Sequence, residues 1–346
     1  MNSPNISVVM PVFNCERYLE ESIQSILSQS FTNFEFIIIN DGSTDKSEEI
    51  IKSFQEQDER IELINQKNQG ITKSLNTGIR FSKGKYIARM DADDISMDNR
   101  LSQQLNFLEK NDKIDILGSQ ALIIDENNQV VSNFKLQPTD DLLIKWELIF
   151  STPLLHPSLM IRKSVFDRFD YYDNKVQFGQ DLHLWRSLAT RVKFSNLPII
   201  LVKIRREQTT KNNLKIINQS LTRISTLPSY LKEICGINFY DFSSSQLSKY
   251  FITGKPIISQ INNYIRLLKK VKNGFIHKND LFKNQIEEIN KKVSFLILRS
   301  MSFNSFSFSY QVQLVKEAIL TFPKILLKKE FWNNLRHIQI VGLFQN

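Results

Sequence analysis

Residues 86–94 read YIARMDADD and join the end of an apolar segment to a group of carboxylates. The apolar beginning is typical of a strand that is buried on both faces of a sheet. Asp91, Asp93 and Asp94 follow within four residues, and such a cluster needs a cation or many hydrogen bonds to offset its repulsion. Mg²⁺ and Mn²⁺ favour carboxylate oxygens and are often shared with substrate phosphates. The segment therefore predicts a divalent metal that bridges to a diphosphate, with a solvated acidic turn or a helix N-cap as the alternative.

Upstream of this segment, strand-like and helix-like patterns alternate along the chain. Apolar, β-branched runs predict buried strands at 6–13, 34–40 and 61–65. Apolar residues at helical spacing predict intervening helices at 18–27, 46–56 and 71–81. This alternation is typical of a doubly wound, mostly parallel α/β sheet with right-handed crossovers. Asn14 is expected to cap the first helix, and Thr44 or Asp45 the second.

Downstream, the same rules predict further elements that complete the sheet. The expected helices lie at 100–109 and 182–189, and the segment 142–150 fits either a helix or a strand. The expected strands are 114–117, 121–124 and 197–204, with a hairpin-like turn at 125–128. Because Pro198 lies inside the last strand and cannot donate a hydrogen bond, we expect that strand at an edge of the sheet.

The expected sheet lacks the glycine-rich loop that often binds phosphates. Since no such loop follows the first strand, a metal held by Asp93 is the expected counter-charge for a diphosphate. Asp41 follows the second strand and is expected to lie at the same sheet edge, where its carboxylate can accept from the imide N–H of uracil. The alternative role of Asp41 is to form a turn before Gly42.

Charge divides the 346-residue chain into two expected regions, 1–210 and 211–346. The first carries 25 Lys and Arg against 29 Asp and Glu, and the second, whose pattern is helical throughout, carries 20 against 7. The basic region indicates an anionic partner, such as a membrane surface, an acidic glycan or nucleic acid. Residues 325–344 fit either a peripheral membrane helix or a core face with extended lysines.

The N-terminus shows no secretory signal, and no apolar run is long enough to cross a membrane. Cys15 and Cys235 are distant in sequence and lack metal-ligand spacing, which fits free thiols in a reducing compartment. We therefore expect a cytoplasmic protein, with contact at the cytoplasmic face of the inner membrane as an option.

Several of these segments together resemble the inverting glycosyltransferases of family 2, across about residues 5–206. The matching segments are ISVVMPVFNCERYLEESIQSILSQSF, FEFIIINDGSTDKS, NQGITKSLNTGIRFSKGKYIARMDADD and FGQDLHLW. The resemblance implies the GT-A fold, a UDP-sugar donor and an Mn²⁺ or Mg²⁺ cofactor. The length and the second region are also similar to bacterial β-1,3-N-acetylglucosaminyl- and galactosyltransferases of lipopolysaccharide, capsule or exopolysaccharide synthesis. That narrower resemblance implies a GlcNAc, Gal or Glc donor and a glycan or lipid-linked acceptor.

The resemblance also implies roles for individual residues. Metal ligation falls on Asp93 and Asp91, general-base catalysis on Asp181, and acceptor-side contacts on His156 and Trp185. Contacts to the nucleotide sugar fall on Pro11, Val12, Phe13, Glu16, Asp41, Arg89, Asp91 and Ala92. One base is sufficient for inversion, because the acceptor hydroxyl attacks opposite the leaving group.

One departure concerns the end of the last strand, where the family often has Tyr-Arg-x-His. Glu207 stands here in place of the histidine, which leaves a third metal ligand open. A sugar-1-phosphate nucleotidyltransferase is an alternative, but it would need a basic glycine-rich loop after the first strand. A non-catalytic nucleic-acid-binding protein is a second alternative, but the aromatic residues follow core spacing and do not form stacking platforms. We therefore expect no nucleic-acid partner.

Overall fold

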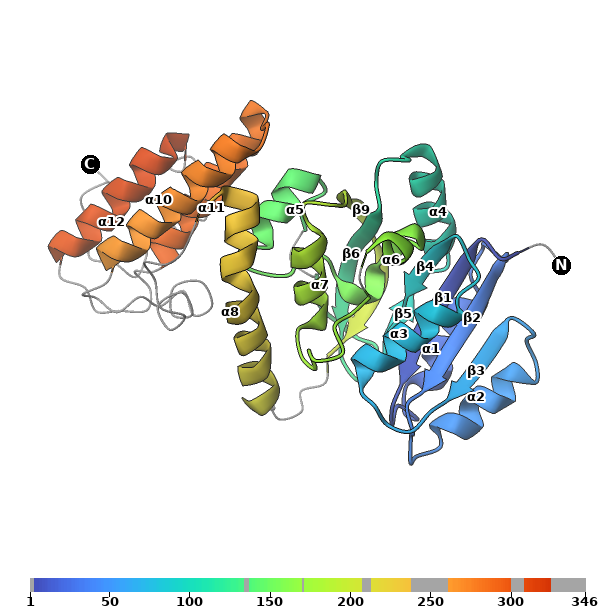
Figure 1. Ribbon diagram of the computed structural model, residues 1–346. Coiled ribbons are helices and arrows are strands. Elements are labelled where there is room, and N and C mark those ends of the chain that lie inside the picture. Colours follow the sequence, from blue (N-terminus) through green and yellow to red (C-terminus); the bar gives the residue numbers. More distant parts are fainter. Residues whose placement is uncertain are drawn as a thin grey trace. The chain divides into compact units, whose positions relative to one another are not determined.

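The computed structural model describes residues 3–133, 137–169, 171–206, 213–237, 261–299 and 308–324 (Figure 1). The chain forms two compact units. The sheet unit comprises Met1–Ile144 and Ser151–Thr222, and the helical unit comprises Lys145–Phe150 and Arg223–Asn346.

The sheet unit is built on a mixed, mostly parallel sheet with the strand order β3-β2-β1-β4-β8-β6-β9-β5, and β7 pairs with β6. The predicted parallel half is confirmed: β1 (Ile6–Val12) pairs in parallel with both β2 (Phe34–Asn40) and β4 (Tyr86–Arg89), and β2 pairs with β3 (Ile61–Asn65). The crossover helices are α1 (Leu19–Leu27), α2 (Ser47–Gln55) and α3 (Ile71–Phe81).

Alternate residues of the central strands face opposite helical layers, because side chains of a strand alternate between its faces. Val8, Met10 and Ile38 lie in a fully buried cluster with apolar residues of α1, α2 and α4 (Arg100–Lys110). On the other face α3 comes so close that a Cβ on Gly78 would lie 2.5 Å from Val9 and 2.7 Å from Ile39. Both faces are thus covered, which explains why the strands are continuously apolar.

The second half of the sheet differs from prediction in two strands. A single strand, β6 (Ile116–Ile124), replaces the two expected strands. Gly118 lies within this strand, and the position requires a glycine because a Cβ there would lie 2.2 Å from Asn196 Oδ1. The last strand, β9 (Phe194–Arg205), is not at the edge, since it pairs with both β6 and β5 (Ile95–Ser96). Pro198 is accommodated by an irregularity: Leu197 is opposite Ser119 and Ile200 is opposite Gln120, so two residues of β9 are skipped.

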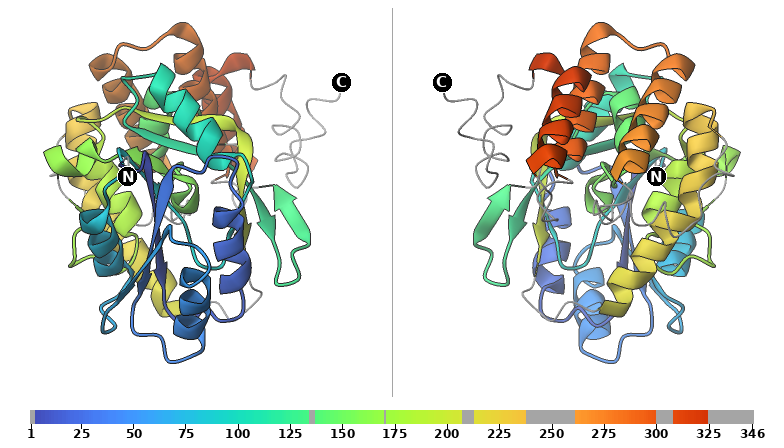
Figure 2. Two further views of the ribbon diagram at one scale, coloured as in Figure 1. Left: turned by 90° about the vertical axis from the view of Figure 1, so that its right-hand side faces the viewer. Right: turned by 90° about the vertical axis from the view of Figure 1, so that its left-hand side faces the viewer.

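Shorter elements complete the sheet unit. The predicted turn at 125–128 is confirmed and leads into β7 (Val130–Asn133), which forms a hairpin with the end of β6 that projects from the sheet (Figure 2). The segment that fitted either a helix or a strand contains a helix, α5 (Asp141–Glu147), of which the residues from Lys145 onward belong to the helical unit. The remaining elements are the 3-10 turn His156–Ser158, β8 (Met160–Arg162), α6 (Ser164–Arg168) and α7 (Gln180–Leu188).

The later part of the chain is helical in its described residues, as predicted. It contains α8 (Asn213–Cys235), α10 (Ile261–Lys278), α11 (Lys283–Arg299) and α12 (Phe308–Thr321). In the helical unit, Trp146 lies edge-on to the rings of Phe150 and Phe275, with centroids 5.3 and 5.2 Å away. None of the described helices is long and apolar enough to span a membrane. The segment 325–344 lies outside the described residues.

Candidate functional site

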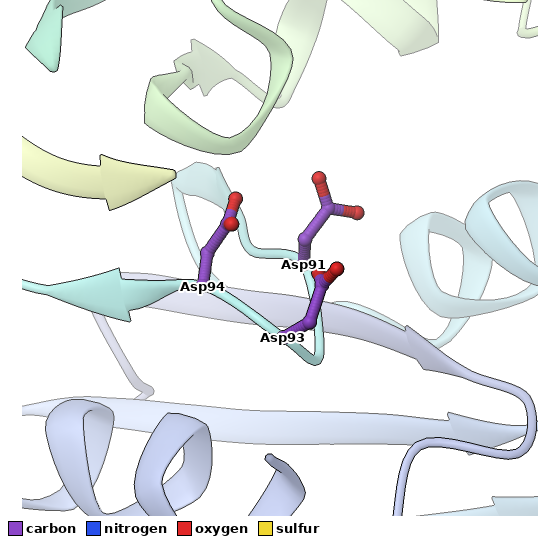
Figure 3. Close-up of side chains that lie close together, drawn as sticks. All are labelled: Asp91, Asp93 and Asp94. Carbon is purple, nitrogen blue, oxygen red and sulfur yellow. The ribbon is translucent and has the colours of Figure 1, made fainter. Parts of the chain in front are cut away.

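The acidic turn, residues 91–94, lies directly after β4, where the predicted carboxylates come together. One carboxylate oxygen from each of Asp91, Asp93 and Asp94 lies within 4.8 Å of the others, and all three side chains rise from one short loop (Figure 3). Asp91 is partly exposed, whereas Asp94 is 2 % exposed. Their oxygens form a donor set that suits a hard divalent cation.

Two carboxylates of the acidic turn, Asp93 and Asp94, are poorly stabilised as anions. Burial, followed by the charge of Asp91, raises the pKa of Asp93 to about 6. Burial and the charges of Asp91 and Asp93 raise the pKa of Asp94 well above its usual range. The buried Asp94 Oδ2 accepts no hydrogen bond from the described part of the chain. A cation at this turn would offset both the repulsion and the missing hydrogen bond.

Two predicted nucleotide-sugar residues at the acidic turn are buried: Arg89 precedes the turn and Ala92 lies within it. Arg89 is 3 % exposed and forms an ion pair with Asp91. Its guanidinium would therefore act on a ligand by orienting and partly neutralising the Asp91 carboxylate. Ala92 is 4 % exposed, and its side chain packs in the main apolar cluster with Met90. Of these two predicted nucleotide-sugar residues, neither therefore presents a freely exposed side chain.

The loops that follow β1 and β2 are hydrogen-bonded to each other; we call residues 13–16 and 43–47 the paired loops. Asn14, at φ +50°, accepts from the backbone N–H of Thr44 at 2.8 Å, so it does not act as the expected helix cap. Glu16 accepts from the backbone N–H of Lys46 and donates its own N–H to Asp45, both at 3.0 Å. Asp45 also accepts from the N–H of Ser47, the first residue of α2, so it supports the start of this helix although the N-cap position itself is Lys46.

Three further predicted nucleotide-binding residues end β1 or begin the paired loops. Val12 is buried, Pro11 is partly buried, and the ring of Phe13 is 48 % exposed. Phe13 therefore presents the largest apolar surface of this group to a ligand.

The Asp41 carboxylate is buried and already holds a turn. It accepts from Gln66 Nε2 at 2.6 Å and from the backbone N–H groups of Gln69 and Gly70 at 2.9 and 2.8 Å. These contacts fix the distant loop that leads into α3 and not the turn before Gly42, while the uracil contact of Asp41 stays a prediction. Its backbone N–H donates to the carbonyl of Val12, which places Asp41 beside the end of β1.

Asp181 lies in the first turn of α7, after Gly179 adopts a left-handed conformation at φ +72°. The segment before it is anchored on α3: Asn76 donates to the carbonyl of Tyr172 and Thr72 to that of Val176, both at 2.8 Å. The same helix α3 thus follows the turn held by Asp41 and supports the segment that leads to Asp181.

Tyr172 links Asp181 to the acidic turn, and sequence reasoning missed it. Burial raises the pKa of the Tyr172 phenol, Arg89 opposes this shift, and the charges of Asp181 and Asp91 both add to it. The pKa of this one buried hydroxyl is thus affected by the charge of the predicted base and by that of a predicted metal ligand. Tyr172 lies in a loop without periodicity, so the sequence carried no signal for its position.

His156 and Trp185 lie together behind this hydroxyl. His156 Nε2 lies 2.7 Å from Tyr172 Oη, and the Trp185 ring centroid is 6.1 Å from that of His156. Trp185 is 0 % exposed, so its predicted direct contact with an acceptor does not fit its position. Burial and the charge of Arg89 hold the pKa of His156 well below its usual range, so the imidazole is neutral.

The end of β9 brings a second missed residue to the turn. Arg205 donates from Nε to the backbone carbonyl of Asp93 at 2.8 Å. Glu207, the suggested replacement for the family's histidine, lies outside the described residues.

Comparison with known proteins gives the family. The family model described as Glycosyl transferase family 2 matches residues 7–169. An uncharacterized glycosyltransferase of Methanocaldococcus jannaschii is 37 % identical over 236 residues, which are 67 % of this chain and 81 % of that protein. An uncharacterized glycosyltransferase of Haemophilus influenzae is 35 % identical over 213 residues, which are 59 % of this chain and 66 % of that protein.

Solved structures give the fold. TarS of S. aureus (residues 1–349, in complex with UDP) aligns with a TM-score of 0.52 at 15 % identity, over 93 % of this chain and 91 % of that 1–349 chain. The mannosyltransferase PcManGT from Pyrobaculum calidifontis, in complex with GDP-Man and Mn²⁺, aligns with a TM-score of 0.50 at 13 % identity, over 95 % and 89 % of the two chains. The chain therefore belongs to glycosyl transferase family 2 and is a glycosyltransferase with the GT-A fold.

Proposed function

We propose that the protein transfers a sugar, with inversion, from a UDP-sugar to a hydroxyl of a glycan or lipid-linked acceptor, and that the reaction depends on Mn²⁺ or Mg²⁺. The observation that carries this proposal is the acidic turn, in which the pKa values of Asp93 and Asp94 are raised and whose member Asp91 acts, together with Asp181, on the pKa of Tyr172.

On the donor side, Asp93 and Asp91 would hold the cation, which when bound neutralises the charge of the leaving UDP. Phe13 and the rest of the paired loops, with Pro11 and Val12 before them, would border the nucleotide base. Asp41 would contribute through the turn that it fixes and through any remaining acceptor capacity of its carboxylate toward the uracil imide.

On the acceptor side, Asp181 is the proposed general base. Its carboxylate takes the proton of the acceptor hydroxyl while that oxygen forms a bond to the anomeric carbon, and the bond to UDP breaks with its electron pair. His156 is a poor competitor for the proton, because its pKa is held well below the ordinary value. His156, Tyr172 and Trp185 would then form the wall that orients Asp181, and they would not bind the acceptor themselves.

The donor sugar is proposed to be GlcNAc, Gal or Glc, and the acceptor a surface oligosaccharide of lipopolysaccharide, capsule or exopolysaccharide synthesis. The net charge of +13 on residues 211–346 supports peripheral contact with an anionic membrane at its cytoplasmic face, where lipid-linked acceptors would be met. Most of the described basic residues of this region lie on helices that also bury apolar side chains, which favours a membrane surface over nucleic acid.

A hydrolysis screen tests the donor and the metal together. The purified protein is incubated with UDP-Gal, UDP-Glc, UDP-GlcNAc, UDP-GalNAc or GDP-mannose, in Mn²⁺, Mg²⁺ or EDTA, and nucleoside diphosphate release is measured. We expect release from one UDP-sugar, with a divalent cation only. Equal turnover in EDTA would overturn the metal dependence, and turnover of GDP-mannose alone would overturn the UDP assignment.

A further inference from the structure

Arg205, the last residue of β9, gathers acceptors from distant parts of the sheet unit. Besides the Asp93 carbonyl, its Nη1 donates to the Asp125 carbonyl at 3.0 Å and to Asn128 Oδ1 at 2.6 Å. Its Nη2 donates to Glu21 Oε2 at 2.8 Å. The Arg205 side chain is 1 % exposed, whereas its partner Glu21 is 42 % exposed, so the buried guanidinium is paired with groups that lie closer to the surface.

The same residue holds the acidic turn a second time through its backbone. The Arg205 N–H donates to Asp94 Oδ1 at 2.8 Å, and the guanidinium lies 4.3 Å from the ring centroid of Tyr18. Asn128, at φ +65°, donates to Glu21 Oε1 at 2.8 Å and thereby closes a ring of hydrogen bonds around the guanidinium. The acidic turn, the start of α1 and the β6–β7 hairpin are therefore all hydrogen-bonded to Arg205.

We propose that Arg205 is a positioning residue: it sets the geometry of the acidic turn for cation binding by anchoring the turn to α1 and to the β6–β7 hairpin. This inference rests on the proposed metal role of the turn. Arg205 touches no reacting atom in this scheme; it acts through the Asp93 carbonyl and the Asp94 carboxylate. A lysine cannot substitute for it, because one ammonium with three donors cannot reach acceptors spread around a planar fork.

Arg162 in β8 provides a matched control within the same unit. It also makes four side-chain hydrogen bonds, to the carbonyls of Ile114, Leu108 and Asn111 and to the hydroxyl of Tyr86, at 2.7 to 3.2 Å. Its guanidinium also lies near a tyrosine ring, 5.4 Å from the centroid of Tyr86. Arg162 is opposite Tyr86, at the start of β4, whereas the acidic turn follows the end of that strand.

The test compares Arg205→Lys and Arg162→Lys in the full chain. Mn²⁺ is titrated calorimetrically into protein saturated with UDP, hydrolysis of the UDP-sugar is followed in parallel, and thermal unfolding reports stability. We expect Arg205→Lys to weaken Mn²⁺ binding by about 10- to 100-fold, as loss of an outer-shell partner does, while UDP affinity in EDTA stays unchanged. We expect Arg162→Lys to lower the melting temperature and leave Mn²⁺ affinity unchanged.

Different outcomes separate the two proposals. Wild-type protein that shows no Mn²⁺ binding in the presence of UDP overturns the proposed function, and the role of Arg205 with it. Wild-type protein that binds Mn²⁺ while Arg205→Lys binds it equally well, or while Arg162→Lys weakens it equally, overturns the Arg205 role alone. Asn128→Ala removes only one partner of Arg205 and serves if Arg205→Lys does not fold. A loss of Mn²⁺ affinity of less than about 10-fold in Asn128→Ala, smaller than that expected for Arg205→Lys, then supports the positioning role of Arg205. An unchanged Mn²⁺ affinity in Asn128→Ala overturns that role.

Discussion

The two ends of β4 use similar side chains in opposite ways. At its start, the Tyr86 hydroxyl donates to Glu109 at 2.7 Å and accepts from Arg162 at 3.0 Å, and Lys85 pairs with the same Glu109 at 2.8 Å. At its end, three carboxylates crowd within one short turn, and Asp94 Oδ2 has no hydrogen-bond partner among the described residues.

Carboxyl pKa values register this difference. Hydrogen bonds from Lys85 and Tyr86 lower the pKa of Glu109, whereas burial and neighbouring charge raise the pKa values of Asp93 and Asp94. The charge at the start of the strand is therefore compensated within the protein. The charge at the end is only partly compensated within the protein, which fits the cation site that we propose there.

The largest expected effect is on sugar transfer and follows removal of the Asp93 carboxylate, which we propose as a cation ligand. Asp93→Ala should reduce sugar transfer by about 10³-fold or more, because electrostatic stabilisation of the leaving group is lost. Glu109→Gln, at the other end of the same strand, should leave transfer per folded molecule unchanged. Steady-state rates with the donor found in the screen check both variants; equal losses would mean that the two ends do not differ in function.

The next largest effect concerns Asp181. Asp181→Asn keeps the size of the side chain but cannot accept the acceptor proton, so transfer should fall by about 10²–10⁴-fold. Affinity for UDP with Mn²⁺, measured by calorimetry, should stay as in the wild type. Collapse of UDP affinity in this variant would show that Asp181 serves the structure of the donor site.

A smaller effect on stability should have opposite signs at the two ends. A carboxyl whose folded pKa is raised destabilises the protein as pH rises through that pKa, so Asp93→Asn should stabilise the metal-free protein at pH 7.5. After solvent screening we expect a gain on the order of 1 kcal/mol, which should vanish at about pH 2.5, below the pKa of the carboxyl in both the folded and the unfolded state.

Glu109 gives the opposite sign at the start of the strand. Its folded pKa is lowered, so its contribution is present at neutral pH and is lost as the pH falls through that value. Glu109→Gln should therefore lower the melting temperature at pH 7.5 but not in strong acid. Thermal unfolding in EDTA across this pH range checks both variants, and a shared sign would contradict the contrast.

The smallest effect should follow Tyr86→Phe. This change removes one hydroxyl from the compensated network and should lower the free energy of unfolding by about 1 kcal/mol. Transfer per folded molecule should not change. Denaturant unfolding measures the first quantity and steady-state kinetics the second, and a selective loss of transfer would mean that this network reaches the site.

Local patterns in the sequence were sufficient for the parallel half of the sheet. The segments 34–40, 61–65 and 71–81 match β2, β3 and α3 at both ends, because buried strands and amphipathic helices carry their own periodicity. The position of Pro198 was misjudged, since a two-residue irregularity in pairing with β6 removes the need for an edge.

The acidic turn could likewise be read from the sequence, but its supports could not. Asp91, Asp93 and Asp94 are adjacent, whereas Arg205 reaches Asp93 across 112 residues of chain. Periodicity carries no information about such contacts. The resemblance implied an acceptor contact for Trp185, and no local pattern indicated that this ring is fully buried.

The paired loops have a consequence for the thermodynamics of ligand binding. Side-chain oxygens of Asn14, Glu16 and Asp45 accept hydrogen bonds from backbone N–H groups of the opposite loop and so tie the two loops together. The entropic cost of ordering the paired loops is therefore incurred during folding. A ligand that docks against them meets loops that are already ordered. Its affinity is accordingly set by contacts and by displaced water, with little penalty from restraining the chain.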